Sequence, residues 1–362
     1  MTPPRRVLVI VTRRIGDVLL ATPVIRSLKR AWPDASIDAL VFSTTAGVLS
    51  ANPDIAHIRT IPERPGLLQH IVFMAKLFRR YDLAISLVPG DRPTLYAFLA
   101  GRMRVGLLLA TRKERWKQHL LHHWVAYDPV GTHTVLTYLS VLKPLQVPPL
   151  AEITASWRDA DEHRAKAMLA PLSNQCYVVL HLYPKFNYKK WSDAGWIALA
   201  RWITDRGLRI VLTGGNDADE RDYVQRLAGS MHAPLNLAGQ LSLNESACVL
   251  ARAAAYVGPD TALTHMAAAL GIPTVTLFGP TDPVKWGPWP KNYDAGNAAS
   301  RTPWRRFGDQ SCGNVRLLQG RAACVPCGHE GCKRNVASFS DCLLQLPPAQ
   351  VIQALNDIIN IQ

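Results

Sequence analysis

The chain has 362 residues, of which 48% are hydrophobic, so it is long enough to bury the cores of two domains. No apolar run reaches the roughly 18 residues of a membrane-spanning helix, and the start of the chain lacks a signal-peptide pattern, so we expect a cytoplasmic protein. The 41 Lys and Arg against 27 Asp and Glu give a net charge of +14, concentrated in residues 1–155, which hold 20 basic and 10 acidic residues. This charge favours an anionic macromolecule or membrane surface as partner, or simply keeps the protein soluble.

The first part of the chain alternates strand-like and helix-like segments. Residues 7–11, VLVIV, have the pattern of an apolar strand, and a glycine turn at residues 13–17 leads into apolar residues at helical spacing up to Trp32. Further strand patterns begin at Ser36 and Tyr81, with an amphipathic helical stretch at residues 67–80 between them. Such alternation predicts a parallel, doubly wound α/β sheet.

A second α/β series follows the proline-rich segment LKPLQVPPL at residues 142–150, and we place the domain linker there or shortly after. Its strand patterns begin at residues 177, 208, 254 and 273, with helical segments between them. We therefore predict two Rossmann-like domains, at residues 1–155 and 156–345. Residues 346–362 carry a helical pattern that we expect to pack back on the first domain.

The turn after the third strand of this second series has the features of an anion site. Gly258 and Pro259 end the strand, and Asp260 or Thr261 can cap the helix that begins near Ala262. Free amides at a helix start and the positive end of the helix dipole favour a phosphate at the carboxyl edge of a parallel sheet. The same turn is equally typical of an ordinary capped helix.

Polar and small residues also follow the two preceding strands. Lys189 lies in a lysine-rich loop, where its ammonium group either neutralises a diphosphate or is solvated. After the next strand, Gly214 and Gly215 let a ligand approach the backbone beside Thr213. A little further along, Asp217 or Glu220 either accepts hydrogen bonds from ribose hydroxyls or places its charge at a helix start.

Two further side chains can act on such a ligand. Asp17 follows the first strand and is a candidate general base, although an aspartate there can also cap a helix. His265 lies one helical turn after Thr261, so it can reach a phosphate or bond the neighbouring backbone. No G-x-G-x-x-G or G-x-x-x-x-G-K-[ST] motif follows a predicted strand, which disfavours dinucleotide and P-loop sites. These positions together predict a nucleotide-diphosphate ligand held between the two domains.

Five of the seven cysteines lie between residues 312 and 342. Four of them form a C-x2-C-x4-C-x9-C pattern and are candidate ligands of a structural metal: Cys324, Cys327, Cys332 and Cys342. The spacing matches no common zinc module, so buried free thiols or a local disulfide are the alternatives.

The same segments carry a resemblance to a known family. They are RRIGDVLLATPVIRSLK from Arg13, KKW from Lys189, LTGG from Leu212 and GPDTALTHMAAALGIPTVTLFGPTDP from Gly258. In this order and spacing they resemble glycosyltransferase family 9, the lipopolysaccharide heptosyltransferases. The resemblance implies a GT-B fold, with two Rossmann-like domains facing across a cleft.

The resemblance also implies roles for individual residues. The diphosphate of the donor would be held by residues of two loops: Lys189, Asp260, Thr261 and Ala262. Residues near Gly215 and Leu241 would contact the nucleoside. An acceptor hydroxyl, deprotonated by Asp17, would attack the anomeric carbon of ADP-heptose as ADP leaves. The reaction would be inverting and would need no divalent ion or other cofactor.

In this family the acceptor is the anionic inner core of lipopolysaccharide on its lipid anchor, which fits a basic first domain. The candidate acceptor contacts are arginines: Arg13, Arg14, Arg92 and Arg104. A basic turn at residues 13–14 resembles the members that add a third, branching heptose. Residues 67–80 and 115–124 either meet the cytoplasmic face of the inner membrane or form core helices with a basic edge.

Three alternatives remain open at the level of sequence. One is transfer of another sugar, because donor choice rests on a few contacts that motifs do not reveal. The second is a nucleotide-sugar epimerase on a similar fold, which would act on the sugar nucleotide without an acceptor. The third is a binding protein without catalysis, although the sequence contains no recognised nucleic-acid module.

Overall fold

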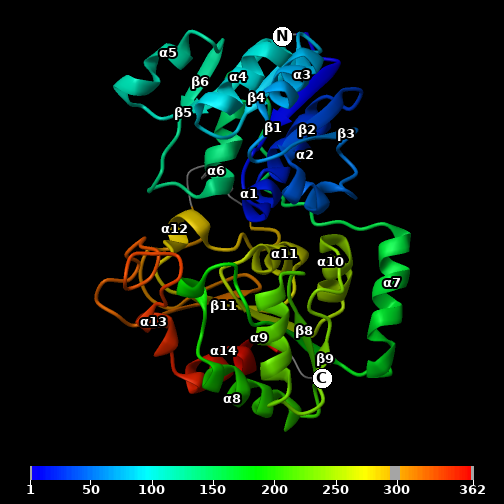
Figure 1. Cartoon of the computed structure of the whole chain (residues 1–362), viewed down its shortest axis with the longest axis vertical. Coiled ribbons are helices and arrows are strands. Elements are labelled where there is room, and N and C mark those ends of the chain that lie inside the picture. Colours follow the sequence, from blue (N-terminus) through cyan, green and yellow to red (C-terminus); the bar gives the residue numbers. More distant parts are fainter. Residues whose placement is uncertain (1, 294–301, 360–362) are drawn as a thin grey trace. The chain divides into compact units, whose positions relative to one another are not determined.

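The computed structural model describes residues 2–293 and 302–359. Contacts divide the chain into two compact units, the first within Met1–Ser156 and the second within Trp157–Tyr293 and Thr302–Gln362. Each unit is a mainly parallel sheet flanked by helices (Figure 1). The division falls shortly after the proline-rich segment of the sequence.

The first unit is built on a six-stranded parallel sheet. In spatial order its strands are β3 (His57–Ile61), β2 (Ser36–Phe42), β1 (Arg6–Ile10), β4 (Tyr81–Ser86), β5 (Gly101–Leu108) and β6 (His123–Ala126). β1 lies between β2 and β4, so the chain order reverses there, as in a doubly wound sheet. The apolar side chains of β1 are fully buried, which explains its continuous hydrophobic pattern.

Six α-helices accompany this sheet: α1 (Ile15–Leu20), α2 (Thr22–Ala31), α3 (Leu67–Leu77), α4 (Asp91–Ala100), α5 (Arg115–Gln118) and α6 (Thr134–Leu139). The helical pattern that ends at Trp32 is therefore two helices. Pro23 lies in the first turn of α2, where its missing N–H is not needed. The short α1 is a separate helix, and Asp17 lies in its first turn.

The proline-rich segment stays on the first unit for several residues beyond its predicted end. The amide of Leu150 donates to Oγ of Ser27 at 2.8 Å, and the amide of Thr154 donates to Oγ1 of Thr22 at 3.0 Å. Both acceptors lie on α2. These bonds satisfy backbone donors of an irregular segment and place the boundary after Ser156.

The second unit is built on a seven-stranded sheet. In spatial order its strands are β12 (Gln310–Cys312), β13 (Val315–Gln319), β11 (Thr274–Phe278), β10 (Ala255–Pro259), β7 (Tyr177–His181), β8 (Arg209–Thr213) and β9 (Leu235–Asn236). All neighbours are parallel except β12 and β13, which are antiparallel. The buried β10 and β11 form its centre.

Eight α-helices belong to this unit: α7 (Asp159–Leu169), α8 (Asp193–Thr204), α9 (Ala218–Ala228), α10 (Leu243–Ala251), α11 (Ala262–Leu270), α12 (Pro283–Trp286), α13 (Asp341–Leu344) and α14 (Pro348–Ile358). Side-chain oxygens of Ser192, Asp217 and Ser242 cap α8, α9 and α10 by accepting first-turn amide protons. Within the described ranges the longest helix has 12 residues, and none is long and apolar enough to cross a membrane.

The expectation that the final helix returns to the first domain is wrong, because α14 completes the core of the second unit. It packs against α8, β11 and β13, and Figure 1 shows it beside α8. Val351 and Leu355, one helical turn apart, are fully buried in the same cluster as Trp196. The apolar face of α14 is therefore buried in the core of the second unit.

Candidate functional site

The strongest site in the second unit lies where the order of its strands reverses. β7 and β10 are parallel neighbours there, and their carboxyl ends lead to Lys189 and Asp260. Nζ of Lys189 lies 2.5 Å from Oδ2 of Asp260 and 3.2 Å from its carbonyl oxygen. Ligands of doubly wound sheets bind at such a reversal. The structure thus joins the lysine loop to the Asp-Thr turn.

The buried carboxyl of Asp260 lies among groups that act in opposite directions on its ionisation. Burial opposes ionisation of this carboxyl, but the ammonium of Lys189, the nearby His265 and a hydrogen bond from Thr281 together hold its pKa below the usual value. Nε2 of His265 lies 3.7 Å from Oδ1 of Asp260. Burial lowers the pKa of His265 to about 4, so its imidazole is neutral at neutral pH. Its Nδ1 is buried and has no hydrogen-bond partner within residues 2–293 and 302–359.

The start of α11 is open to a ligand. Thr261 occupies the N-cap position in an extended conformation, but its side chain does not accept a hydrogen bond from the helix. Its hydroxyl lies 3.4 Å from Oγ1 of Thr264, and Asp260 is turned to Lys189. The first-turn amides, beginning with Ala262, therefore keep the anion-binding potential of an uncapped helix start. This geometry disfavours the alternative of an ordinary capped helix.

In the loop after β8, acidic side chains accept hydrogen bonds from backbone amides of the loop and of the helix that follows it. Asp217 is the N-cap of α9 and accepts a hydrogen bond from the amide of Asp219 at 3.1 Å, so the helix-start alternative holds for this residue. The amide of Gly215 donates to Oε1 of Glu220 at 2.6 Å. Thr213 is buried, with Oγ1 3.3 Å from Nδ1 of His181. The loop is thereby rigid before any ligand binds.

The two glycines of this loop pack closely against the carboxylate of Glu220. A Cβ at Gly214 would lie 3.0 Å from Oε1 of Glu220, and one at Gly215 would lie 2.9 Å from Oε2 of the same residue. Leu241 is half-buried after β9, directly before the cap of α10. Because β10, β7, β8 and β9 are successive neighbours, these loops follow the same edge of the sheet.

Lys189 and Lys190 are adjacent in this loop, but their side chains lie in different surroundings. Nζ of Lys190 lies 3.7 Å from the ring centre of Tyr183 and 4.8 Å from that of Tyr223. Burial lowers the pKa of Lys190. Lys190 is thus held by aromatic faces, and Lys189 alone meets Asp260.

The first unit places Asp17 where the order of its own sheet reverses, after β1. Arg14 is the N-cap of α1, and Asp17 lies in the first turn, where it is buried. The hydroxyl of Tyr138 in α6 donates to Oδ1 of Asp17 at 3.3 Å. Asp17 is therefore not the capping residue. Tyr138 was missed because the sequence pattern gave no sign of α6.

The surroundings of Asp17 suit a base. Burial raises the pKa of its carboxyl, while Arg13 first, then Tyr138 and Arg14, act in the opposite direction and leave the pKa raised. A carboxylate with a raised pKa holds a proton better near neutral pH, which is what general base catalysis needs.

The predicted acceptor arginines do not form one group. Arg13 and Arg14 are exposed beside Asp17, and Arg92 is exposed at the start of α4, where Nη1 donates to the carbonyl of Glu63 at 2.9 Å. Arg104 is different: it lies within β5, four residues before the carboxyl end of that strand, and its Nε donates to Nδ1 of His122 at 3.1 Å. Arg104 therefore lies inside the strand and not in a loop at its carboxyl end, and its role as an acceptor contact stays a prediction.

The cysteine pattern does not assemble a metal site. All seven cysteines have free thiols. Burial, and then the neighbouring thiols of Cys332, Cys324 and Cys327, raise the pKa of Cys342 to about 12. No group of three or more His, Cys, Asp or Glu side chains in the described part of the chain is placed to hold a metal ion. The choice between a metal, free thiols and a local disulfide stays a prediction.

Comparisons with known proteins agree with this architecture. The model of glycosyltransferase family 9 (heptosyltransferase) matches residues 73–311. Lipopolysaccharide heptosyltransferase 3 of Escherichia coli strain K12 is 33% identical over 298 residues, which cover 78% of this chain and 86% of that protein.

Two solved structures are similar over nearly the whole chain. The glycosyl transferase family 9 protein of Veillonella parvula has a TM-score of 0.78 at 18% identity, covering 98% of this chain and 97% of that one. The E. coli heptosyltransferase WaaC with ADP has a TM-score of 0.70 at 22% identity, covering 97% and 99%. These likenesses show that the two doubly wound units form a GT-B fold. With the family match and the 33% identical relative, they establish that the chain belongs to glycosyltransferase family 9, the heptosyltransferases.

Proposed function

We propose that this glycosyltransferase moves a heptose from ADP-heptose to the inner core of lipopolysaccharide, as the third, branching heptose. The observation that carries the proposal is the pairing of Lys189 with Asp260 beside the uncapped start of α11. The names of the relatives support the substrates, since one is a lipopolysaccharide heptosyltransferase 3 and another was solved with ADP.

The second unit would hold the donor. Asp260 orients the ammonium of Lys189 through its carboxylate and its carbonyl oxygen, which leaves the third N–H group to bind a diphosphate. The first-turn amides of α11 face the same anion, and neutral His265 can add a hydrogen bond without a charge. The nucleoside would lie along the loops of Gly215 and Leu241.

The first unit would supply the base. Asp17 accepts the proton of an acceptor hydroxyl, whose oxygen forms a bond to the anomeric carbon on the face opposite the diphosphate. The bond from that carbon to the phosphate oxygen breaks, and ADP leaves with the electron pair. Attack on the opposite face inverts the anomeric centre. Lys189 and the α11 amides stabilise the charge that develops on the leaving group, so the reaction needs no divalent ion.

A substrate panel tests this proposal. The purified protein is supplied with ADP-heptose or competing sugar nucleotides, and with lipopolysaccharide cores truncated at successive heptoses, in chelator and in added Mg²⁺. We expect one heptose to be added to the core that already carries two, at equal rates in both buffers. Conversion of the sugar nucleotide without acceptor would indicate an epimerase, and transfer of a different sugar would redefine the donor.

The location of the enzyme follows from its acceptor. A lipid-anchored, anionic core would bring the protein to the cytoplasmic face of the inner membrane as a peripheral protein. The basic excess of residues 1–155 supports contact of this part with such a surface.

A further inference from the structure

Helix α3 (Leu67–Leu77) of the first unit has an apolar face turned away from its own core. Leu67, Leu68, Ile71 and Val72 are 79%, 76%, 49% and 45% exposed. With Ala75, which is also exposed, they occupy an arc of roughly 140° on a helix of 3.6 residues per turn. A surface helix of a soluble protein normally shows polar residues on this arc. The face therefore lacks its partner within the described chain.

The opposite side of α3 fixes this orientation. Nε2 of His70 lies 2.9 Å from the hydroxyl of Tyr96 in α4, and the ring of Phe73 packs edge-on against the same tyrosine at 5.8 Å. Leu77 is buried in the core of the unit. Because these contacts anchor one side of α3, the helix cannot turn to bury Leu68 and Ile71 without losing them.

Positive charge borders the apolar face. Residues 64–81 contain four basic side chains and no carboxylate. The basic residues are Arg64, Lys76, Arg79 and Arg80. In the described structure, the side chains of Lys76 and Arg80 form no hydrogen bond or ion pair, so both charges are available to a partner.

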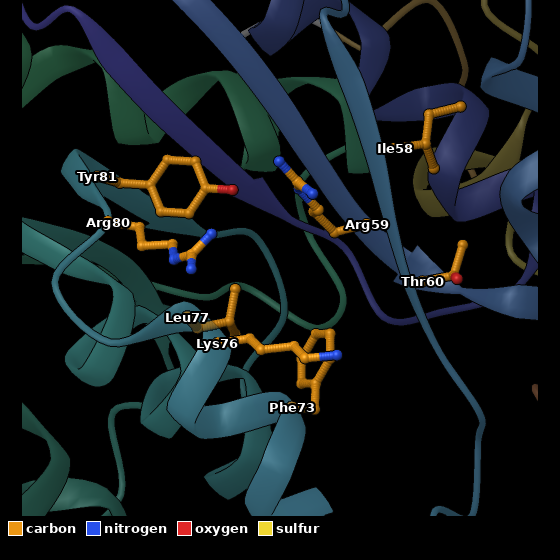
Figure 2. Close-up of a pocket in the computed structure, with 8 residues that line it drawn as sticks. All are labelled: Ile58, Arg59, Thr60, Phe73, Lys76, Leu77, Arg80 and Tyr81. Carbon is orange, nitrogen blue, oxygen red and sulfur yellow. The ribbon is translucent and has the colours of Figure 1, made fainter. Parts of the chain in front are cut away.

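A pocket of about 280 Å³ lies at the end of α3, between the helix and the edge strand β3. Figure 2 shows Lys76, Arg80 and Arg59 around this pocket, which Phe73 and Leu77 also line. Nε of Arg59 is held at 3.0 Å by Oδ2 of the buried Asp38, so its position is fixed. The pocket has the size and charge for a phosphate headgroup.

We propose that α3 docks the enzyme on an anionic phospholipid bilayer, with Leu67, Leu68, Ile71 and Val72 in the acyl region and the pocket cations on headgroup phosphates. This inference rests on the proposed function, because a lipid-anchored acceptor has to be met at a membrane. A second copy of the chain is a poorer occupant, since a symmetric pairing of this face would bring the cations of Lys76 and Arg80 against their copies. Apolar side chains bordered by cations are what an anionic bilayer surface binds.

The other basic stretch of the sequence, residues 115–124, is not part of this surface. Its helix α5 has four residues, and Nζ of Lys117 is buried 2.6 Å from Asp91 and 2.7 Å from Glu114. The charge of Lys117 is thus neutralised by these two carboxylates, whereas Arg115 and Trp116 of the same stretch are exposed.

Vesicle flotation of the full chain tests the proposal. Wild type is expected to float with phosphatidylcholine vesicles that contain phosphatidylglycerol and to remain behind with phosphatidylcholine alone. Leu68→Ser with Ile71→Ser should weaken binding about tenfold or more, through loss of inserted apolar surface. Lys76→Gln and Arg80→Gln should each weaken it roughly fivefold. Val336→Ser, at an equally exposed apolar position of the second unit, is the control and should bind as wild type.

Two further measurements separate the outcomes. Circular dichroism checks that the L68S/I71S variant is folded, and light scattering shows whether the wild type self-associates. Unchanged vesicle binding by this variant would overturn the proposal. A wild-type dimer that becomes a monomer in this variant would overturn it as well. Transfer is then measured with a lipid-embedded core and with the same core freed of its acyl chains. The variant should lose rate only on the embedded acceptor. Absence of transfer to either core, with vesicle binding still dependent on α3, would reject the proposed function and leave the docking surface standing.

Discussion

Lys189 and Asp260 are 71 positions apart in the chain, yet the ammonium of the first lies 2.5 Å from the carboxylate of the second. Both follow strands that are neighbours at the reversal of strand order in the second sheet. In the proposed donor site Asp260 would orient a cation, and the open amides of α11 would complete an anion-binding surface.

Replacing Lys189 tests this surface. Lys189→Ala should weaken ADP binding by about 1.5–3 kcal/mol, because a charge-assisted contact with the diphosphate is lost. Titration calorimetry measures the affinity. Lys185→Ala, at an exposed lysine of the same loop, should bind ADP as the wild type does. Equal affinity of the Lys189 variant and wild type would remove Lys189 from the donor site.

Replacing Asp17 separates binding from chemistry. Asp17→Asn keeps the shape of the side chain but cannot accept the acceptor proton, so kcat should fall roughly a hundredfold to ten-thousandfold while ADP affinity is retained. Initial rates and calorimetry on the same preparation measure both. A variant with a rate near that of wild type would show that Asp17 is structural.

The hydroxyl of Tyr138 should tune the base. Its hydrogen bond to Asp17 favours the carboxylate, so Tyr138→Phe should raise the pKa of Asp17 further. Because the base acts when ionised, the acid limb of the kcat/KM profile should move to higher pH, with smaller effects on the alkaline side. A lower rate at every pH without displacement of that limb would point to a packing role alone.

His265 should make the free energy of unfolding depend on pH. Its pKa is about 4 in the folded protein and near 6.5 when exposed, so folding favours the neutral ring. The stability contributed by this difference is present above pH 6.5 and is lost as pH falls towards 4. In urea unfolding, His265→Gln should therefore show a shallower loss of unfolding free energy over this window. His232→Gln, at an exposed histidine, should keep the wild-type slope.

Much of the fold was predictable because its strands and helices have clear periodicity. The patterns beginning at residues 177, 208, 254 and 273 became β7, β8, β10 and β11 with shifts of one residue at most. Strands β5 and β6 and helix α6 are among the elements that were missed. β6 has four residues, mostly exposed, and α6 has six, all buried, so neither shows an apolar and a polar side.

The sequence by itself determined the α/β class, the succession of elements and the positions of Asp17, Lys189 and Asp260 after strands, because these depend on local patterns and turns. Only the tertiary structure decided which residues meet. It paired Lys189 with Asp260, placed Tyr138 on Asp17, set Arg104 inside β5 and joined α14 to the second unit. Those contacts depend on the order of strands in each sheet and on which helix faces are buried. Local periodicity carries neither.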